Sequence, residues 1–310
     1  MFNTNFKSLI EIVTTFSEEQ KCIEYLEQMR WENGVVSPFD ETSKVYKCKG
    51  GKYRCKNTGK YFNVRTNTLF DNTKIPLQKW FLAIWIVTCH KKGISSIQLS
   101  KDVDVTQKSA WFMLQRIRAC FEVENYNDLE GIVEADESFY GGKNKNRHRN
   151  KKVQKSQGRS FKDKVPILGM LERGGKLTAI AIPNGTSAPV IQPLIKKYVK
   201  ENSTFISDDW KGYKGLDSSY NQFMVKHTDT NLNYSHPNPE IHTNNIEGAW
   251  KIMKNSLRDN YNNVSKKHLQ KYVDEFVYRF NMRQNIESDK FNWLLYNSDK
   301  RTKYLDLIND

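Results

Sequence analysis

The spacing of apolar residues divides the chain into segments of different character. Residues 1–33 place apolar side chains three and four positions apart, which predicts helices with one buried face. Residues 34–72 instead show short alternating runs between glycines, such as KYRCKN and KYFNVRT, which predict small β-hairpins. Residues 73–125 return to helical spacing, with Pro76 suited to a first helical turn and an apolar run at 80–87 that predicts a buried helix.

The stretch GISSIQLSKDVDVTQKSAWFMLQRIRACF within residues 73–125 has the pattern of a helix-turn-helix. Ser95 and Thr106 are suited to cap one helix each, because their hydroxyls can accept a hydrogen bond from a first-turn N–H. The second helix would direct polar and basic side chains outward, where they could meet DNA bases or phosphates. These candidate DNA-binding residues are Gln107, Lys108, Arg116 and Arg118. The same pattern also fits an ordinary helical hairpin.

Residues 130–285 predict an α/β domain. GIVEADESF reads as a strand, VPILGMLERG and KLTAIAIP as a hairpin, APVIQPLIKKYVKE as a helix and STFISDD as a further strand, followed by helices. This order predicts an RNase H-like fold, a mixed sheet flanked by helices. Residues 286–310 are expected to form a C-terminal tail.

The charge balance favours a polyanionic partner. Lys and Arg number 49 against 35 Asp and Glu, a net charge of +14 at pH 7, and cations placed on phosphates release condensed counterions. The five cysteines are odd in number and unevenly spaced, so no disulfide framework is expected. The N-terminus lacks a signal-peptide pattern, and KWFLAIWIVTCHKK is too short to span a bilayer. We expect no membrane partner and a cytoplasmic, nucleoid-associated protein in a bacterium, or a nuclear one in a eukaryote.

Acidic residues stand where the predicted elements meet a core. Asp136 lies inside an apolar strand, Asp208 follows another, and Glu247 falls in the first turns of a helix. An unpaired carboxylate in such a place is costly, so bringing these together requires a cation, for which Mg²⁺ or Mn²⁺ is suited. Two such ions about 4 Å apart support phosphodiester chemistry. Lys254 lies two helical turns after Glu247 on the same face and could bind a DNA phosphate.

Other interpretations of these positions remain open. Glu134 and Glu137 flank Asp136, and Asp209 follows Asp208, so the assignment could shift by one or two residues. Alternation along a strand places Glu134 on the face of Asp136 and Glu137 on the opposite face. The acids could also be unrelated and solvated.

A basic loop is predicted between the first two strands of the α/β domain, at residues 143–164, with Asp163 as its only acid. A run of charge is usually a solvated face, but beside a metal site for phosphodiesters it could clamp DNA. The candidate DNA contacts in this loop are Lys143, Lys145, Arg147, Arg149, Lys151 and Lys152.

The blocks VEADESFYGGKNKNRH, SDDWKGY, HTNNIEGAWKIMK and KHLQKYVDEFVYRFNMR resemble, in this order, those of ISXO-type insertion-sequence transposases, relatives of the Merlin elements. The resemblance covers residues 30–285. It implies that Asp136, Asp208 and Glu247 form a DDE triad, and that Lys254 is the basic residue that follows it. It further implies metal-dependent cleavage at terminal inverted repeats, 3′-hydroxyl strand transfer into double-stranded target DNA, and a homo-oligomer when two ends are synapsed.

The chain departs from that family in its N-terminal module. The family usually carries a zinc ribbon with two C-x-x-C pairs, whereas alignment places at those positions Ser37, Asp40, Cys55 and Thr58. Zinc requires thiolate or imidazole ligands, so we expect a degenerate ribbon-shaped module without zinc. Its expected supports are its hairpins and Tyr53, Tyr61 and Phe62. The loss leaves two rivals open: an inactive or domesticated DNA-binding protein, and a stand-alone RNase H-like nuclease.

Overall fold

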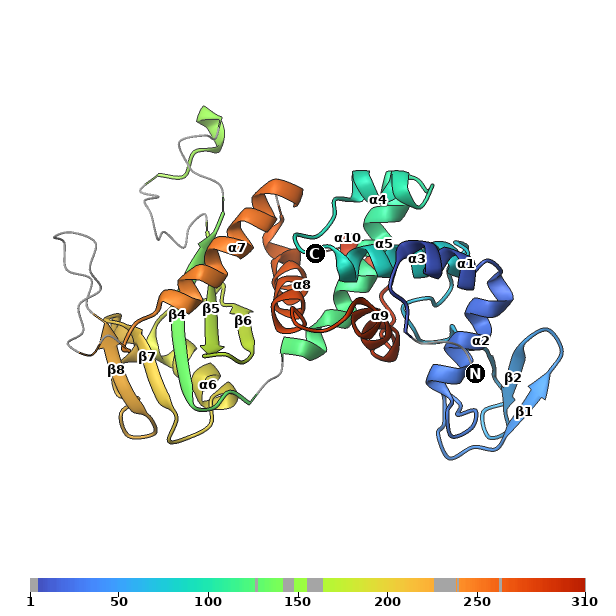
Figure 1. Ribbon diagram of the computed structural model, residues 1–310, viewed down its shortest axis with the longest axis horizontal. Helices are drawn as coiled ribbons and strands as arrows, with labels where there is room; N and C mark the ends of the chain where they lie inside the picture. Colours follow the sequence, from blue (N-terminus) through green and yellow to red (C-terminus); the bar gives the residue numbers. More distant parts are fainter. Residues whose placement is uncertain are drawn as a thin grey trace. The chain divides into compact units, whose positions relative to one another are not determined.

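The computed structural model describes residues 5–125, 128–141, 148–154, 164–225, 238, 240–261 and 264–309. The chain divides into two compact units (Figure 1). The helical unit comprises Met1–Val123 and Gln284–Asp310, and the α/β unit comprises Glu124–Arg283. Residues 286–310, expected as a tail, therefore belong to the helical unit and contain two helices, α9 (Glu287–Tyr296) and α10 (Tyr304–Ile308).

The helical unit is built around an aromatic core. Its remaining helices are α1 (Leu9–Thr15), α2 (Glu19–Arg30), α3 (Leu77–Cys89), α4 (Ser96–Asp102) and α5 (Gln107–Cys120). A 3₁₀ turn at Phe121–Asn125 follows α5 and includes the first residues of the α/β unit. Phe16 contacts the rings of Tyr25 and Phe81 edge-on, with centroids 5.0 and 4.7 Å away. Phe291 from α9 packs against Phe81 at 5.6 Å, so the chain's end completes this core. The buried apolar helix predicted at 80–87 is confirmed within α3.

The helix pair α4 and α5 has the predicted caps but not the predicted outward face. Ser95 accepts from the Gln98 N–H at 3.1 Å and Thr106 from the Ser109 N–H at 3.2 Å, which confirms both caps. Arg116 and Arg118 are only 5% and 1% exposed, so their predicted outward orientation is wrong.

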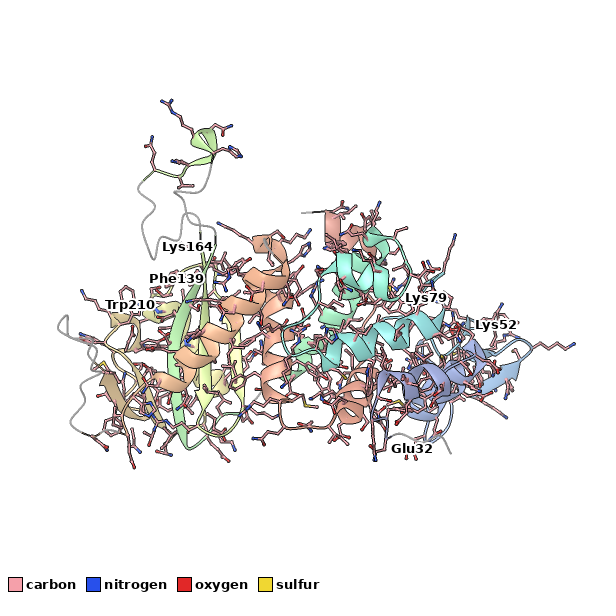
Figure 2. All side chains as sticks on the ribbon, turned by 45° about the horizontal axis from the view of Figure 1, so that its top comes forward. Glu32, Lys52, Lys79, Phe139, Lys164 and Trp210 are labelled. Atoms are coloured by element: carbon pink, nitrogen blue, oxygen red, sulfur yellow. The ribbon has the colours of Figure 1, made fainter. Side chains whose placement is uncertain are left out.

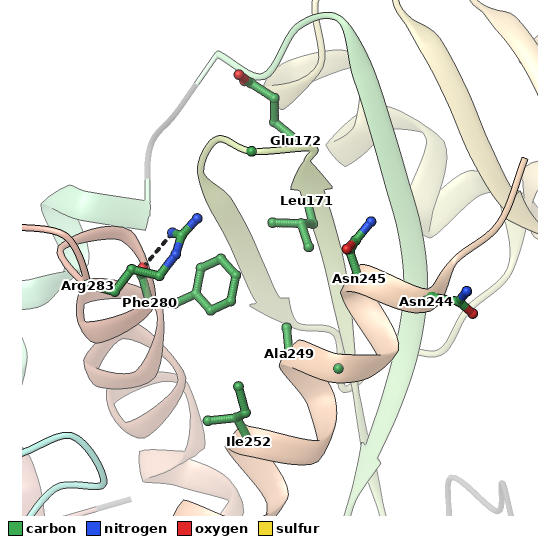
Figure 3. A pocket seen from close by; sticks show the side chains of 10 residues that line it. Leu171, Glu172, Asn244, Asn245, Ala249, Ile252, Phe280 and Arg283 are labelled. Carbon is green, nitrogen blue, oxygen red and sulfur yellow. Dashed lines mark hydrogen bonds between the residues drawn. The ribbon is translucent and has the colours of Figure 1, made fainter. Parts of the chain in front are cut away.

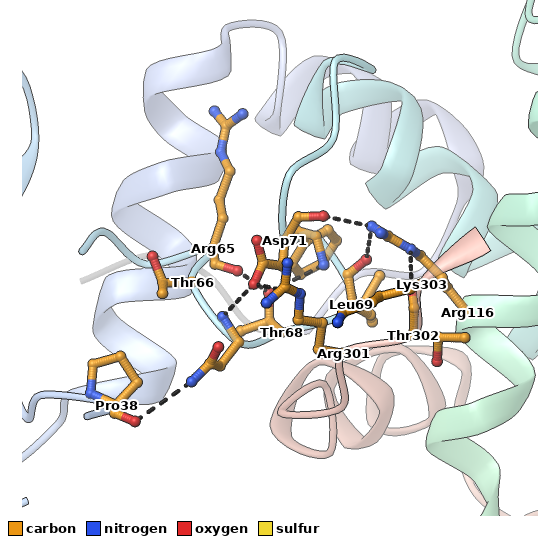
Figure 4. Close-up of polar contacts among 12 residues, drawn as sticks. Pro38, Arg65, Thr66, Thr68, Leu69, Asp71, Arg116, Arg301, Thr302 and Lys303 are labelled. Carbon is orange, nitrogen blue, oxygen red and sulfur yellow. Dashed lines mark hydrogen bonds and ion pairs between the residues drawn. The ribbon is translucent and has the colours of Figure 1, made fainter. Parts of the chain in front are cut away.

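Arg116 is occupied inside the helical unit (Figure 4). Its guanidinium donates to the carbonyls of Leu69 at 2.9 Å, Asp71 at 2.8 Å and Thr302 at 3.1 Å. A guanidinium has several N–H donors. Those of Arg116 hydrogen-bond both the loop before α3 and the chain's C-terminal segment, which links the two. Arg116 is therefore a structural residue of this unit and has no free face for DNA.

The ribbon-like module is a small antiparallel sheet in the order β1-β2-β3. Its strands are β1 (Val45–Cys48), β2 (Lys52–Cys55) and β3 (Tyr61–Phe62). Tyr53 and Phe62 form its core as predicted, together with Cys55, and Trp31 packs edge-on against Tyr53 at 5.0 Å. Tyr61 is 60% exposed, so its predicted role in this core is wrong.

The α/β unit holds one five-stranded sheet in the order β6-β5-β4-β7-β8. The strands are β4 (Ile132–Tyr140), β5 (Val165–Glu172), β6 (Leu177–Ala181), β7 (Thr204–Asp208) and β8 (Asn221–Val225). β5 pairs antiparallel with both β4 and β6, whereas β7 pairs parallel with both β4 and β8. The predicted α/β class and mixed sheet are confirmed, and β8 is an edge strand that the sequence did not predict.

Helices cover both faces of this sheet (Figure 1). On one face α7 (Asn244–Tyr261) and α8 (Leu269–Asn281) bury side chains of β5 and β6. On the other face α6 (Ala188–Tyr198) packs over β4, β5 and β7. Val133 and Ala135 of β4 belong to the α6 side, so alternation places Glu134 and Asp136 on the α7 side.

Within the described part of the chain, every helix is too short or too polar to cross a membrane.

Candidate metal centre

Three carboxylates converge at one end of the sheet in the α/β unit. Asp136, Glu137 and Asp208 each offer an oxygen, and these oxygens lie within 4.8 Å of one another. Asp208 is buried, and the other two are half-buried. Carboxylates accept hydrogen bonds but cannot donate them, so the group cannot satisfy itself and is suited to a divalent cation.

The strand ends explain why these side chains meet. β7 stops at Asp208, and its last pair with β4 is Ser207 with Ala135. Beyond that pair β4 runs on to Tyr140 with no further pairing on this side among the described residues, so carboxylates from both of its faces can turn toward the end of β7. Phe139, Lys164 and Trp210, labelled in Figure 2, lie at this same end of the sheet.

A buried phenol supports the group from the α6 side. Burial raises the pKa of Tyr213 well above its usual value, and the neighbouring charges of Glu137, Asp136 and Asp208 raise it further. The phenol therefore stays protonated beside these carboxylates. Tyr213 is fully buried and packs beside Phe205.

Glu247 lies in the first turn of α7 and is not a member of the carboxylate group. Its carboxylate accepts a hydrogen bond from the Thr243 hydroxyl at 3.2 Å, and its N–H donates to the Thr243 carbonyl at 3.1 Å. The structure thus brings together Asp136 and Asp208 of the predicted triad, adds Glu137, and holds Glu247 at the start of the covering helix.

A glycine lets that helix approach the sheet closely. Gly169 of β5 pairs with Asp136 in the register, and a Cβ built on Gly169 would collide with the ring of Trp250 and lie 3.1 Å from Ile246. Ile246 and Trp250 bracket Glu247 on α7. The missing side chain at Gly169 therefore sets how near Glu247 comes to the strand that carries Asp136.

A pocket lies beside the first turns of α7 (Figure 3). It is lined by Leu171 and Gly174 of the β5–β6 hairpin, Gly248 of α7 and Phe280 of α8, among others. None of the three grouped carboxylates lines it. The candidate chemistry therefore lies at the strand ends and not in this pocket.

The predicted basic residues have varied surroundings. Lys254 is exposed on α7, as are Lys251 and Arg258 on the same helical face. In the predicted basic loop, Arg149 and Lys152 are exposed, while the side chains of Lys143, Lys145, Arg147 and Lys151 lie outside the described residues. In the helix pair, the exposed candidates that remain are Gln107 and Lys108.

The positions aligned with zinc ligands do come together in the ribbon-like module. Ser37 and Asp40 form an isolated β-bridge, and the Asp40 carboxylate accepts from the Asn57 amide at 2.8 Å. This hydrogen bond is the largest cause of a lowered pKa at Asp40. Asn57 precedes Thr58, so the bond links the two loops that would carry the ligand pairs.

Cys55 supplies the one thiol at these positions. Desolvation raises its pKa, but hydrogen bonds with the hydroxyls of Ser37, Ser43 and Thr58 lower it to about 6. Cys48 cannot assist, because it pairs with Lys52 while Cys55 pairs with Val45, which separates the two thiols by about 10 Å along the hairpin.

The sequence pattern did not assign a role to two acids near Asp136, Glu137 and Glu134. Glu137 was expected on the opposite face of its strand, and only the early end of β7 brings it to the group. Glu134 is fully buried and contacts the first turn of α7. The signal that could have found both is the density of acids in the strand, EADE, since strands rarely bury several carboxylates without partners.

Family models match both units. The ISXO2-like transposase domain matches residues 128–281, and the transposase zinc-ribbon domain matches residues 17–60. An uncharacterised protein in transposable element ISH50 of Halobacterium salinarum is 27% identical over 281 residues, covering 86% of this chain and 92% of the relative. An uncharacterised transposase-like protein of Haemophilus influenzae is 30% identical over 107 residues, covering 34% of this chain and 81% of the relative.

Solved structures of Mos1 transposase show weaker similarity. The Mos1 strand transfer complex shares 14% identity with a TM-score of 0.29, covering 67% of this chain and 74% of that one. A pre-cleavage Mos1 transpososome shares 11% identity with a TM-score of 0.25, covering 98% and 100%. Similarity at this level supports neither a fold nor an activity.

Proposed function

Because the chain belongs to the family of ISXO2-like transposases, we propose that its carboxylate group is the centre that cuts and joins DNA at the ends of a mobile element. The chain is a DDE-type DNA transposase, and the convergence of Asp136 with Asp208 carries the assignment of its site. The sheet order and strand directions support an RNase H-like type for the α/β unit.

The donor set fits hard divalent cations. Asp136 and Asp208 would be the shared ligands, with Glu247 completing the triad from α7 and Glu137 lying beside the buried phenol of Tyr213. Oxygen ligands of this kind suit Mg²⁺ or Mn²⁺, and we propose a pair of ions. When bound, such ions would make an oxygen nucleophile more reactive and stabilise the charge on the leaving oxygen.

Basic residues would position the DNA strands. Lys251, Lys254 and Arg258 follow Glu247 at helical spacing and are exposed, so they form a cationic stripe that leads away from the triad helix. Arg149 and Lys152 would add contacts to backbone phosphates. Gln107 and Lys108 remain candidates for reading the terminal repeats, whereas buried Arg116 and Arg118 do not.

Strand transfer requires two element ends, so we propose that the active form on double-stranded DNA is at least a homodimer. One observation favours a second candidate function, a DNA-binding protein that no longer catalyses: the altered ligand positions of the ribbon-like module. That alteration would affect the recognition of DNA ends, and it leaves the carboxylate group intact.

The test uses double-stranded DNA carrying the repeats that flank this gene, with a labelled 3′-hydroxyl end, a supercoiled target plasmid and Mn²⁺. We expect end cleavage and joining of label to plasmid. Asp208→Asn should lower both rates by about three orders of magnitude, because it removes a cation ligand worth several kcal/mol in the transition state. Asp209→Asn is the matched control, since Asp209 is exposed and outside the group.

The same assay separates the roles of the two glutamates. Glu247→Gln should lose activity as Asp208→Asn does, whereas Glu137→Gln should retain most of it. Cleavage without joining would indicate a stand-alone nuclease. Binding of the repeat DNA with neither reaction would indicate the non-catalytic protein.

A further inference from the structure

The first turn of α7 is capped by a carboxylate from another element. Glu134 of β4 is fully buried, and its Oε2 accepts hydrogen bonds from the N–H groups of Asn245 at 3.0 Å and Ile246 at 3.1 Å. Its Oε1 accepts from the Asn245 side-chain amide at 2.7 Å. First-turn N–H groups lack partners within their own helix, and the helix dipole favours a negative charge there. Figure 3 shows Asn245 in this first turn, with its side chain directed differently from that of Asn244.

A second residue, Arg173, connects the segment before α7 to the same hydrogen-bond network. Arg173, just after β5, donates from Nε to the Oε1 of Glu134 at 2.7 Å. The same guanidinium donates to the carbonyls of Glu240 at 2.7 Å and His242 at 2.9 Å, and it contacts the His242 Nδ1 at 3.1 Å. Arg173 therefore holds the segment before α7 while Glu134 holds the helix start.

The network lies between Glu247 on α7 and Asp136 on β4, two members of the proposed triad. Glu134 and Asp136 share a face of β4 and stand about 7 Å apart along it. Asn245 and Ile246, which Glu134 binds, directly precede Glu247. A shift of the α7 terminus would therefore move Glu247 relative to Asp136 and Asp208.

We propose that Glu134 is a positioning residue that fixes Glu247 against the strand bearing Asp136, with Arg173 as its partner. The inference rests on the proposed function of the carboxylate group. Glu134 is distinguished from a cation ligand by its contacts, because both of its oxygens already accept hydrogen bonds from the donors named above. Its contribution to the centre is thus geometric.

The test compares Glu134→Gln with Glu130→Gln, a matched loss of charge at an exposed glutamate that pairs with Lys200. Two quantities are measured on folded protein without DNA: amide hydrogen exchange at residues 245–248, and Mn²⁺ affinity by calorimetry. Glu134→Gln should speed exchange in the first turn of α7 and weaken Mn²⁺ binding by about tenfold, since outer partners of metal ligands have effects of that size. Glu130→Gln should leave both quantities within about twofold of the wild type.

A lower melting temperature with unchanged exchange and unchanged Mn²⁺ affinity would overturn the proposal. Should Glu134→Gln fail to fold, Arg173→Lys and Arg173→Met replace it. The lysine, which keeps the charge and a single donor nitrogen, should retain more Mn²⁺ affinity than the methionine, and equal affinities would overturn the proposal. If the wild type binds no Mn²⁺, the proposed function fails separately. Exchange at residues 245–248 then decides alone, and unchanged exchange rejects the role of Glu134.

Discussion

The ribbon-like module and the α/β unit each bring polar side chains together where a metal is expected in this family. The two clusters differ in the chemical groups that occupy these positions. In the ribbon-like module, Ser37 and Thr58 hydrogen-bond with Cys55, and Asp40 is held by Asn57. In the α/β unit, Asp136, Glu137 and Asp208 converge with no donor among themselves. The polar groups of the ribbon-like module include both donors and acceptors, whereas the three carboxylates take their donors from outside the group, as Asp208 does from the Trp210 N–H at 3.2 Å.

The difference follows from the chemistry of the groups. Hydroxyls and amides both donate and accept, so they can replace a metal whose role is to cross-link two loops. Carboxylates only accept and repel one another, so no rearrangement of hydrogen bonds within the group substitutes for a cation. A structural metal site can therefore lose its ligands while the module keeps its fold, whereas a cation site for phosphodiester chemistry cannot lose its ligands and keep its activity.

The largest expected effect is the restoration of zinc. The triple substitution Ser37→Cys, Asp40→Cys and Thr58→Cys should bind one Zn²⁺ per chain, because the backbone already brings these positions to Cys55. Binding of structural zinc is worth about 10 kcal/mol. Zinc content by mass spectrometry and displacement from a chromogenic chelator measure this, with Cys48→Ser added to the triple variant as the control. Stoichiometric zinc in the purified wild type would remove the contrast between the two clusters.

A smaller effect is expected where α7 meets the sheet. Gly169→Ala should reduce the free energy of unfolding by about 1–3 kcal/mol, since its Cβ would collide with the Trp250 ring. It should also lower cleavage activity by displacing Glu247.

Gly248→Ala is the matched control for that change, because a Cβ at Gly248 meets nothing within 4 Å and alanine favours a helix. Denaturant melts should show it unchanged or stabilised by up to about 1 kcal/mol. If both variants have equal stability, the close approach of α7 is not what holds this part of the unit together.

The smallest effect concerns the thiol of the ribbon-like module. The pKa of Cys55 is lowered from 9.0 to about 6, so the folded state favours the thiolate. The resulting stabilisation is complete above pH 9, shrinks as the pH falls, and is gone below pH 6. The 240 nm absorbance difference between wild type and Cys55→Ser should titrate with a midpoint near pH 6. A midpoint near pH 9 would show that the hydroxyls do not hold the thiol as described.

The sequence predicted what depends on local chemistry. Ser95 and Thr106 cap their helices because capping needs only the residue and the next turn. The order of strands and helices in the α/β unit could be predicted because buried strands appear in the sequence as apolar runs. Arg116 was misplaced because its partners include the Thr302 carbonyl, far away in the sequence, which no helical periodicity reveals.

The candidate site could be predicted only in part, for a similar reason. Asp136 and Asp208 follow from strand contexts, but Glu137 joins them only because β7 ends before β4 does. β8 was missed because its pattern, NQFMV, leaves most of its side chains outward and gives a weak apolar signal. Relative strand lengths and edge positions are properties of the assembled sheet, so the sequence of a single strand does not reveal them.

The central claim is that the carboxylate group holds divalent cations, and its most direct test is the anomalous signal of Mn²⁺ soaked into crystals of the protein. We expect a peak about 2.1 Å from oxygens of both Asp136 and Asp208, with Glu247 as a further ligand and the peak lost in Asp208→Asn. Mn²⁺ bound elsewhere on the chain, with none between Asp136 and Asp208, would contradict the account.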